Sequence, residues 1–166
     1  MGFLRSPVGE EPVVLEGLFR APLARVYRAW TDPEQIVQWF GPGREKGKGC
    51  LISATLDLRV GGHWHFVLSQ DDGGRASLQG TYSVVETESC LSFSWCHVRE
   101  TADGRREETP RSQVTVRFRA EGASTHVYLR HEGILREDGR KGVGGGWDAS
   151  FQQLGDWLAA AVTGPA

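Results

Sequence analysis

Two histidines, His97 and His131, are the residues of this sequence best placed to do chemistry inside a folded domain. Each ends a stretch of alternating apolar and polar residues, the pattern of a strand with one buried face. Both fall on the apolar side of their strands, and a third strand, over 112–120, is expected between them. The two histidines are therefore predicted at the same end of one sheet, roughly 10 Å apart. A ligand's polar group or a water fits between them, although two rim histidines that reach solvent or a backbone carbonyl are the plainer interpretation.

Other motifs have plain explanations as well. His63 and His65 flank Trp64 with the spacing of some metal ligands, but their face of the strand points to solvent and a third ligand is missing. The glycine run 142–146 precedes a helix but matches no phosphate-binding fingerprint, which favours a hinge. The charged run 99–111 is a solvated flap or, alternatively, a lid. We therefore expect no metal, no cofactor and no catalytic residue, and favour a role other than catalysis.

Composition narrows the class of protein. The chain has 166 residues, 39% of them hydrophobic and 24% charged, and a net charge of −2. These values suit one globular domain and give no electrostatic reason to expect nucleic acid as a partner. No apolar run is long enough for a membrane span. Three cysteines, none of them in a CxxC pair, indicate reduced thiols and a cytoplasmic location.

The elements that position the histidines follow from hydrophobic periodicity. Residues 1–11 are predicted to be a disordered leader and residues 12–163 a single domain. A first strand over 13–20 is followed by a helix over 22–30. A second short helix begins at Asp32-Pro33, where a capping residue precedes proline in the first turn.

Six further strands follow, each with one apolar face, which predicts an antiparallel sheet packed on one side. The turn at Glu121–Ser124 has glycine first, as in a type II′ hairpin, and pairs Phe118 with Val127 and Val114 with His131. The turn at 71–74 would place Phe66 opposite Gly80 and Trp64 opposite Tyr82. In both hairpins apolar residues meet apolar residues, as a correct register requires.

A glycine-rich connection over 133–146 should lead to a long amphipathic helix that begins near Trp147. Laid across a curled sheet of about seven strands, one helix fills only part of the concave space. The fold class is therefore α+β, with an apolar cavity between sheet and helix, unless large side chains fill it. The predicted lining comprises Trp64, Phe66, Tyr82, Phe93, Trp95, His97, Val116, Phe118, Leu129, His131, Trp147, Phe151, Leu154 and Leu158.

Several motifs together resemble one family. They are Phe19–Pro22, Val26–Glu34, Trp39–Pro42, Asp57–Gly62, Gly80–Tyr82, Leu91–Trp95, Thr125–Glu132 and Gly146–Leu154. Over residues 13–161 the chain resembles homologues of the activator of the 90-kDa heat-shock chaperone ATPase, within the START/birch-allergen-like (SRPBCC) superfamily. The resemblance implies the helix-grip fold with a hydrophobic cavity beneath the C-terminal helix. It does not name a ligand.

Three functions fit these expectations. The first is to bind or carry a hydrophobic small molecule in the cavity. The second is a small cyclase or dehydratase that uses cavity groups such as Tyr82, His97 and His131. The third is a cochaperone-like or regulatory interaction module whose protein partner the sequence does not name. A homodimer formed through strand edges or the Trp39 region is compatible with each of them.

Overall fold

The structure, a computed structural model, describes residues 3–41, 48–70 and 74–163. Its elements are β1 (Val13–Phe19), α1 (Leu23–Thr31), α2 (Pro33–Trp39), β2 (Lys48–Leu56), β3 (His63–Gln70), β4 (Arg75–Glu86), β5 (Cys90–Glu100), β6 (Arg106–Glu108), β7 (Ser112–Glu121), β8 (Ser124–Glu132) and α3 (Glu137–Thr163). Seven strands form one antiparallel path in the order β1-β8-β7-β5-β4-β3-β2, and the short β6 pairs with β5.

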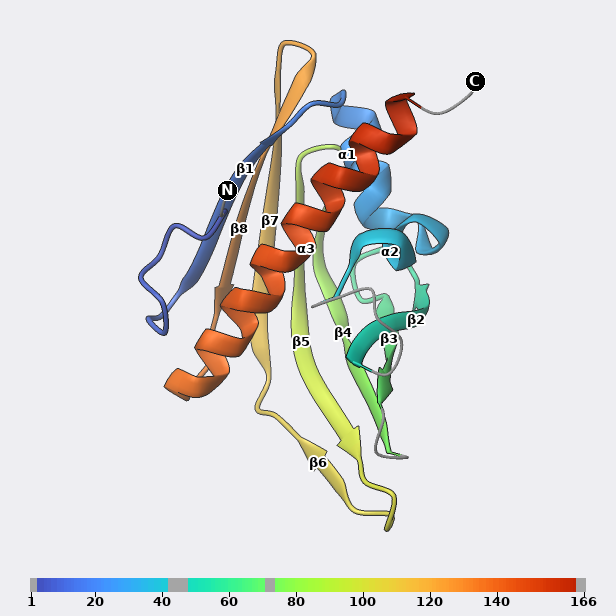
Figure 1. The fold of residues 1–166 in the computed structure, drawn as a ribbon, viewed down its shortest axis with the longest axis vertical. Coiled ribbons are helices and arrows are strands. Elements are labelled where there is room, and N and C mark those ends of the chain that lie inside the picture. Colours follow the sequence, from blue (N-terminus) through green and yellow to red (C-terminus); the bar gives the residue numbers. More distant parts are fainter. Residues whose placement is uncertain (1–2, 42–47, 71–73, 164–166) are drawn as a thin grey trace.

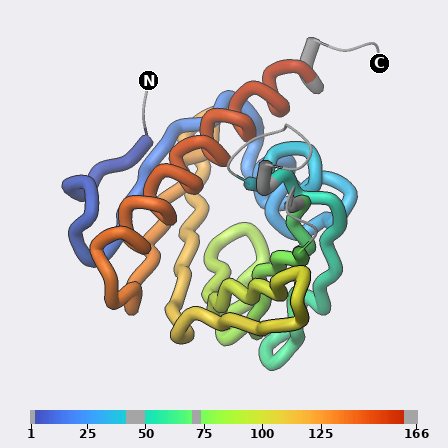
Figure 2. The backbone as a smooth tube through the Cα atoms, turned by 60° about the horizontal axis from the view of Figure 1, so that its bottom comes forward, coloured from blue at the N-terminus to red at the C-terminus, as the bar shows by residue number. Residues whose placement is uncertain are grey.

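The sheet curls around the long helix α3, which runs diagonally across its concave face (Figure 1). The short helices α1 and α2 cover the upper part of that face, whereas β6 and the start of α3 lie at the opposite end. Figure 2 shows the same curl from this lower end. This is the helix-grip fold, so the predicted fold class is confirmed. Among the described helices, none is long and apolar enough to cross a membrane.

The start of α2 follows the predicted capping pattern. The Asp32 side chain accepts a hydrogen bond from the Glu34 backbone N–H at 3.0 Å, and Pro33 occupies the first turn. Proline has no N–H to lose there, and Asp32 satisfies a donor that the helix leaves free. The cap directs α2 so that Trp39 is fully buried, and its indole N–H donates to the Ala29 carbonyl at 2.9 Å.

The β7–β8 hairpin has the predicted register. Phe118 lies opposite Val127, and Val114 opposite His131. Gly122 has a φ of +60°, the left-handed value that the first loop position of a type II′ turn requires. This turn thereby places the apolar faces of both strands on the concave side.

The β3–β4 register differs from the prediction by two residues. Trp64 lies opposite Gly80, and Phe66 opposite Leu78. The turn that would fix this register, over 71–73, lies outside the described residues. A slip of two residues leaves every side chain on its predicted face, because the side-chain period of a strand is two.

The sequence alternation in and after β2 places Ile52, Ala54, Leu56 and Leu58 inward; this is wrong at Ile52, whereas the other three pack against the core. The register shifts on both sides of Leu51, as at a β-bulge. Leu51 is buried, whereas Ile52, which the alternation placed inward, is 54% exposed. An irregularity of this kind inserts a residue and exchanges the two faces of the strand.

The glycine-rich connection predicted over 133–146 is wrong from Glu137 onward, because α3 begins there. Two acidic residues lie in its first turn, where the helix dipole favours negative charge. The Arg140 guanidinium donates to the carbonyls of Gly9 and Ile134 at 2.6 and 2.9 Å. These hydrogen bonds stabilise the first turns of α3, where each glycine costs roughly 1 kcal/mol relative to alanine.

The prediction of a disordered leader over 1–11 is corrected for residues 3–11, which pack on the domain. Leu4 forms a backbone bridge with Leu15 of β1. The Asp148 carboxylate on α3 accepts the backbone N–H groups of Phe3 and Leu4 at 2.6 and 3.2 Å. The N-terminal segment therefore extends the sheet beyond β1.

Candidate functional site

A cluster of aromatic side chains fills the centre of the concave face. Trp30 and Phe40, from the α1–α2 region, contact Trp147 of α3 at ring-centroid distances of 5.9 and 5.5 Å. Trp64 packs against Trp95 at 5.7 Å. The void left among these rings measures about 20 Å³, enough for about one water. In this central region the alternative of a filled core holds.

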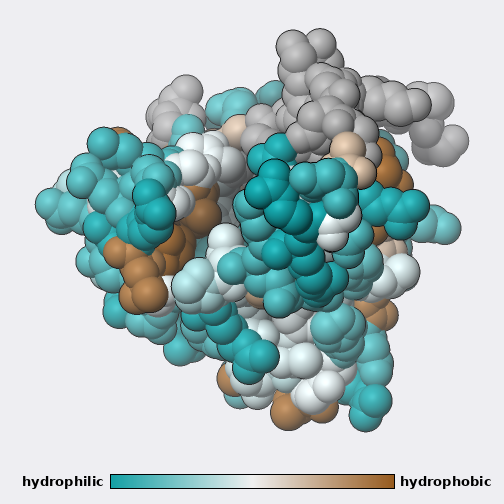
Figure 3. Space-filling view, turned by 90° about the horizontal axis from the view of Figure 1, so that it is seen from below, coloured by the Kyte–Doolittle hydropathy of each residue, from teal (hydrophilic) through white to brown (hydrophobic). Residues whose placement is uncertain are grey.

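A much larger cavity lies beyond this cluster, between the lower ends of β3, β4 and β5 and the first half of α3. Its volume is about 610 Å³, within the range of small-molecule sites. Seen from this end, apolar atoms gather beside a recess between hydrophilic lobes (Figure 3). We call it the α3 cavity; its lining is Phe40, Gly41, Leu68, Leu78, Trp95, His97, Thr109, Pro110, Ser112, Gly133, Ile134, Leu135, Arg136, Gly139, Gly142, Val143, Gly146, Trp147 and Ser150.

Missing side chains on α3 help to leave this space open. Gly139, Gly142 and Gly146 recur at the three- and four-residue spacing of one helix face, and all three line the cavity. A Cβ atom built on Gly142 or Gly146 would meet no heavy atom within 4 Å. The result is a recess that is open to solvent and lined mainly by apolar atoms, which is typical of a small-molecule site.

His131 belongs to a buried hydrogen-bond network behind Ser112 and Trp147, which line the α3 cavity. The Trp147 indole N–H donates to His131 Nδ1 at 3.1 Å, and His131 Nε2 lies 2.7 Å from Ser112 Oγ. An indole N–H can only donate, so Nδ1 is the acceptor and Nε2 carries the proton. Ser112 Oγ in turn donates to the Trp95 carbonyl at 3.4 Å. The network fixes the ring of Trp147, which separates the central void from the α3 cavity.

Burial of His131 determines its charge. The residue is fully buried, and the loss of solvation lowers its pKa to about 3. His131 is therefore neutral at physiological pH, in the tautomer that the network requires. All its ring nitrogens are occupied by protein partners, so it positions Trp147.

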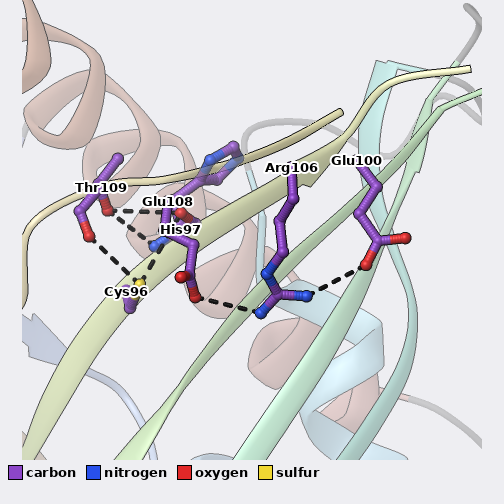
Figure 4. Close-up of polar contacts among 6 residues, drawn as sticks. All are labelled: Cys96, His97, Glu100, Arg106, Glu108 and Thr109. Atoms are coloured by element: carbon purple, nitrogen blue, oxygen red, sulfur yellow. Dashed lines mark hydrogen bonds and ion pairs between the residues drawn. The ribbon is translucent and has the colours of Figure 1, made fainter. Parts of the chain in front are cut away.

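His97 has a different environment, on the face of β5 that lines the α3 cavity. Its backbone N–H donates to Thr109 Oγ1 at 2.9 Å, which holds the β6 side of the hairpin against β5. In Figure 4 the His97 ring points away from the ion pairs that Arg106 makes with Glu100 and Glu108. Burial, together with the nearby Arg99, lowers the pKa of His97. The neutral ring offers one donor and one acceptor.

The predicted pairing of His97 with His131 at one end of the sheet is wrong. Val114 lies opposite both Phe93 and His131, so His131 is level with Phe93. His97 lies four residues farther along β5, about 13 Å at the rise of a strand. There β5 has left β7 and pairs with β6. The sequence pattern does not show where one partner strand replaces another.

The predicted lining residues divide into three groups. Trp95, Trp147 and His97 line the α3 cavity. Trp64, Phe66, Tyr82 and Phe93 line the small central void instead. Neither lining includes the remaining seven, which are buried in the core: Val116, Phe118, Leu129, His131, Phe151, Leu154 and Leu158.

Sequence reasoning missed most of the α3 cavity lining. Leu68 and Leu78 continue the inward alternation of β3 and β4, and that alternation was the available signal for them. Arg136 and the lining residues of the first part of α3 fall in the predicted connection over 133–146, where the glycine run hides the helical spacing. The flap over 99–111 contributes Thr109 and Pro110 through the β5–β6 hairpin.

The other predicted motif is at the surface. His63 is exposed, and His65 is half-buried. Among the residues described, no group of three His, Cys, Asp or Glu side chains lies close enough to hold a metal ion.

A protein-family model matches most of this chain. The model of the family described as Activator of Hsp90 ATPase homolog 1-like protein matches residues 20–159. The chain belongs to this family. The match begins directly after β1 and extends through most of α3, so it includes β3, β4, β5 and α3, which frame the α3 cavity.

Solved structures share the fold of this Activator of Hsp90 ATPase homolog 1-like chain. Protein NE0264 from Nitrosomonas europaea is 20% identical with a TM-score of 0.72, over 92% of this chain and 97% of that one. CalU16 from Micromonospora echinospora is 26% identical with a TM-score of 0.62, over 96% and 84%. DynU16, from the dynemicin biosynthetic locus, is 19% identical with a TM-score of 0.67, over 92% and 48%. No protein with curated annotation matches the chain.

Proposed function

We propose that this protein binds or carries a hydrophobic small molecule in the α3 cavity. The observation that supports this most is an apolar space of about 610 Å³ beneath the helix in a fold commonly used as a ligand-binding scaffold. Apolar side chains that face water in a recess of this size favour an apolar ligand, because the ligand removes their surface from water. The three free cysteines support a cytoplasmic location.

The alternative of a cyclase or dehydratase has less support. Such chemistry needs inward groups that can exchange protons with a substrate. His131 is engaged at both ring nitrogens, and Tyr82 faces the central void, where burial raises its pKa. Only His97, of the three groups considered, faces the α3 cavity.

Binding of N-phenyl-1-naphthylamine, an uncharged probe that fluoresces in apolar surroundings, tests the proposal. Gly146→Leu directs a side chain into the cavity, and Gly145→Leu is the matched control. Gly145 is the adjacent residue, lines the groove on the other side of α3, and has the same free space at its Cβ position. Both changes replace glycine with a better helix former, so both should raise the midpoint of thermal unfolding.

The two variants should differ in binding. Gly146→Leu should weaken probe binding about tenfold or more, since it occupies part of the site and removes the contacts that a buried ligand makes. Gly145→Leu should bind as the wild type does. The proposal would be refuted if the wild type did not bind the probe, or if Gly146→Leu and Gly145→Leu bound it with the same affinity. Native mass spectrometry of gently purified protein then identifies the mass of any bound molecule.

A further inference from the structure

The α3 cavity has a polarity that narrows the class of its ligand. Most hydrogen-bonding side chains of the lining already have protein partners. Ser150 Oγ donates to the Gly41 carbonyl at 3.1 Å and accepts its N–H at 3.0 Å. Ser112 belongs to the buried network, and Thr109 Oγ1 is bonded to the backbone of His97. These hydroxyls serve the protein's own structure.

The ring of His97 is different, because no hydrogen bond joins it to any other residue that the structure describes. In the unliganded protein, water in the cavity can satisfy its nitrogens. A ligand that fills the cavity removes that water. A ligand without a polar group near His97 would leave a buried donor and acceptor unpaired, which is unfavourable.

The described residues that line the α3 cavity carry positive charge and no negative charge. Among the lining residues that the structure describes, Arg136 is the only charged one and none carries a carboxylate. Asp138 accepts two hydrogen bonds from Arg136 at 3.1 and 3.3 Å, but both side chains are more than 70% exposed, so water screens the pair and a ligand's acid can compete for the guanidinium. Glu100 and Glu108 are engaged with Arg106 on the other face of the hairpin (Figure 4).

This arrangement disfavours other ligand classes. A cationic ligand would be buried without a carboxylate partner. A sugar or other polyol would need many hydrogen-bonding groups, and the lining offers few uncommitted ones. A plain hydrocarbon would leave His97 unpaired.

We infer that the ligand is an amphipathic acid, with an apolar body against Leu78, Trp95 and Trp147 and an acidic group that meets His97 within the cavity and Arg136 at its mouth. This inference rests on the proposed function. It assigns His97 and Arg136 as specificity-determining residues. The neutral imidazole donates its N–H to an acid oxygen, and the guanidinium supplies the opposite charge.

Two probes with the same ring skeleton test the inference. 8-Anilinonaphthalene-1-sulfonate is N-phenyl-1-naphthylamine with one added sulfonate. The wild type should bind the sulfonate probe more tightly. His97→Leu should weaken it about tenfold by removing the hydrogen bond, and Arg136→Gln about threefold, because an exposed charge contributes less. Neither change should weaken the uncharged probe.

Controls separate a site from surface attraction. Lys141→Gln removes one positive charge from the same part of α3, at a residue that lines the groove on the other side of the helix. It should leave both affinities unchanged. His97→Gln retains a donor and an acceptor and should restore most of the sulfonate affinity that His97→Leu loses. Thermal unfolding of each variant verifies that it is folded.

The possible results are distinguishable. If the wild type prefers the uncharged probe, or if His97→Leu or Arg136→Gln leaves the preference unchanged, the inference is overturned and the proposed function stands. An equal loss with Lys141→Gln also overturns it, because the sulfonate would then be attracted by general surface charge. If the wild type binds neither probe, the proposed function fails as well.

Discussion

Acidification should destabilise this protein through His131. The residue is held neutral in the native state, with a pKa of about 3, whereas an unfolded chain presents a histidine with a pKa near 6.5. As pH falls below about 6.5, the unfolded state takes up a proton that the native state excludes. The free energy of unfolding therefore falls with pH between about 6.5 and 3 and is restored as pH rises.

The size of the effect follows from the two pKa values. For one group that titrates only in the unfolded state, the loss between pH 7 and pH 5 is about 2 kcal/mol. The slope below pH 6 approaches about 1.4 kcal/mol per pH unit. His97, whose pKa is also lowered, adds a contribution of the same sign. A comparison with a variant at His131 isolates the part that belongs to the network.

His131→Gln is the suitable variant, since an amide offers both an acceptor for Trp147 and a donor for Ser112 without titrating. Urea unfolding of both proteins at pH 7 and pH 5 gives the four free energies required. The wild type should lose about 2 kcal/mol more than the variant over this interval. Equal losses in the two proteins would refute the assignment of a neutral, buried His131. Nitrogen NMR should show the proton on Nε2.

Three further substitutions have defined outcomes. Gly80→Ala should prevent folding or lower the free energy of unfolding by more than about 3 kcal/mol, because its Cβ would lie 1.9 Å from the Ser94 carbonyl oxygen; soluble yield and thermal unfolding test this. Thr125→Val should cost about 1–3 kcal/mol in urea unfolding, since the buried hydroxyl donates to the Ala21 carbonyl at 2.8 Å. Asp148→Ala should release Phe3 and Leu4, and their amides should then exchange hydrogen faster; unchanged exchange would show that the carboxylate does not hold the segment.

Local turn chemistry explains why part of the fold was predictable. At Gly122 the residue type, the loop length and the alternation of both strands lead to one register, and the structure has that register. The turn at 71–74 does not fix the register in the same way, and Trp64 lies opposite Gly80, two residues from the predicted partner Tyr82. Both hairpins kept the correct faces, because face depends only on whether the position is odd or even.

The candidate site was harder to predict, because it depends on where α3 begins. A run of glycines usually indicates the end of a helix, and here it lies within one, with Gly142 and Gly146 toward the α3 cavity and Gly145 on the other side. Once Gly142 and Gly146 are helical, space opens at the lower end of the sheet and away from the aromatic cluster. The hydrogen-bond partners of His131 could not be predicted from the sequence either. Trp147 lies sixteen residues farther along the chain, in α3, and only tertiary packing brings its indole N–H to His131.

The N-terminal segment has a consequence for assembly. The sheet path ends at β1 and β2, and the bridge between Leu4 and Leu15 occupies the outer edge of β1 with the protein's own backbone. A covered edge cannot serve as a template for a strand from another molecule. Among the described strands, β2 and the short β6, which pairs only with β5, keep an unpaired outer edge. Strand pairing with another molecule through this part of β1 therefore requires the segment to detach first.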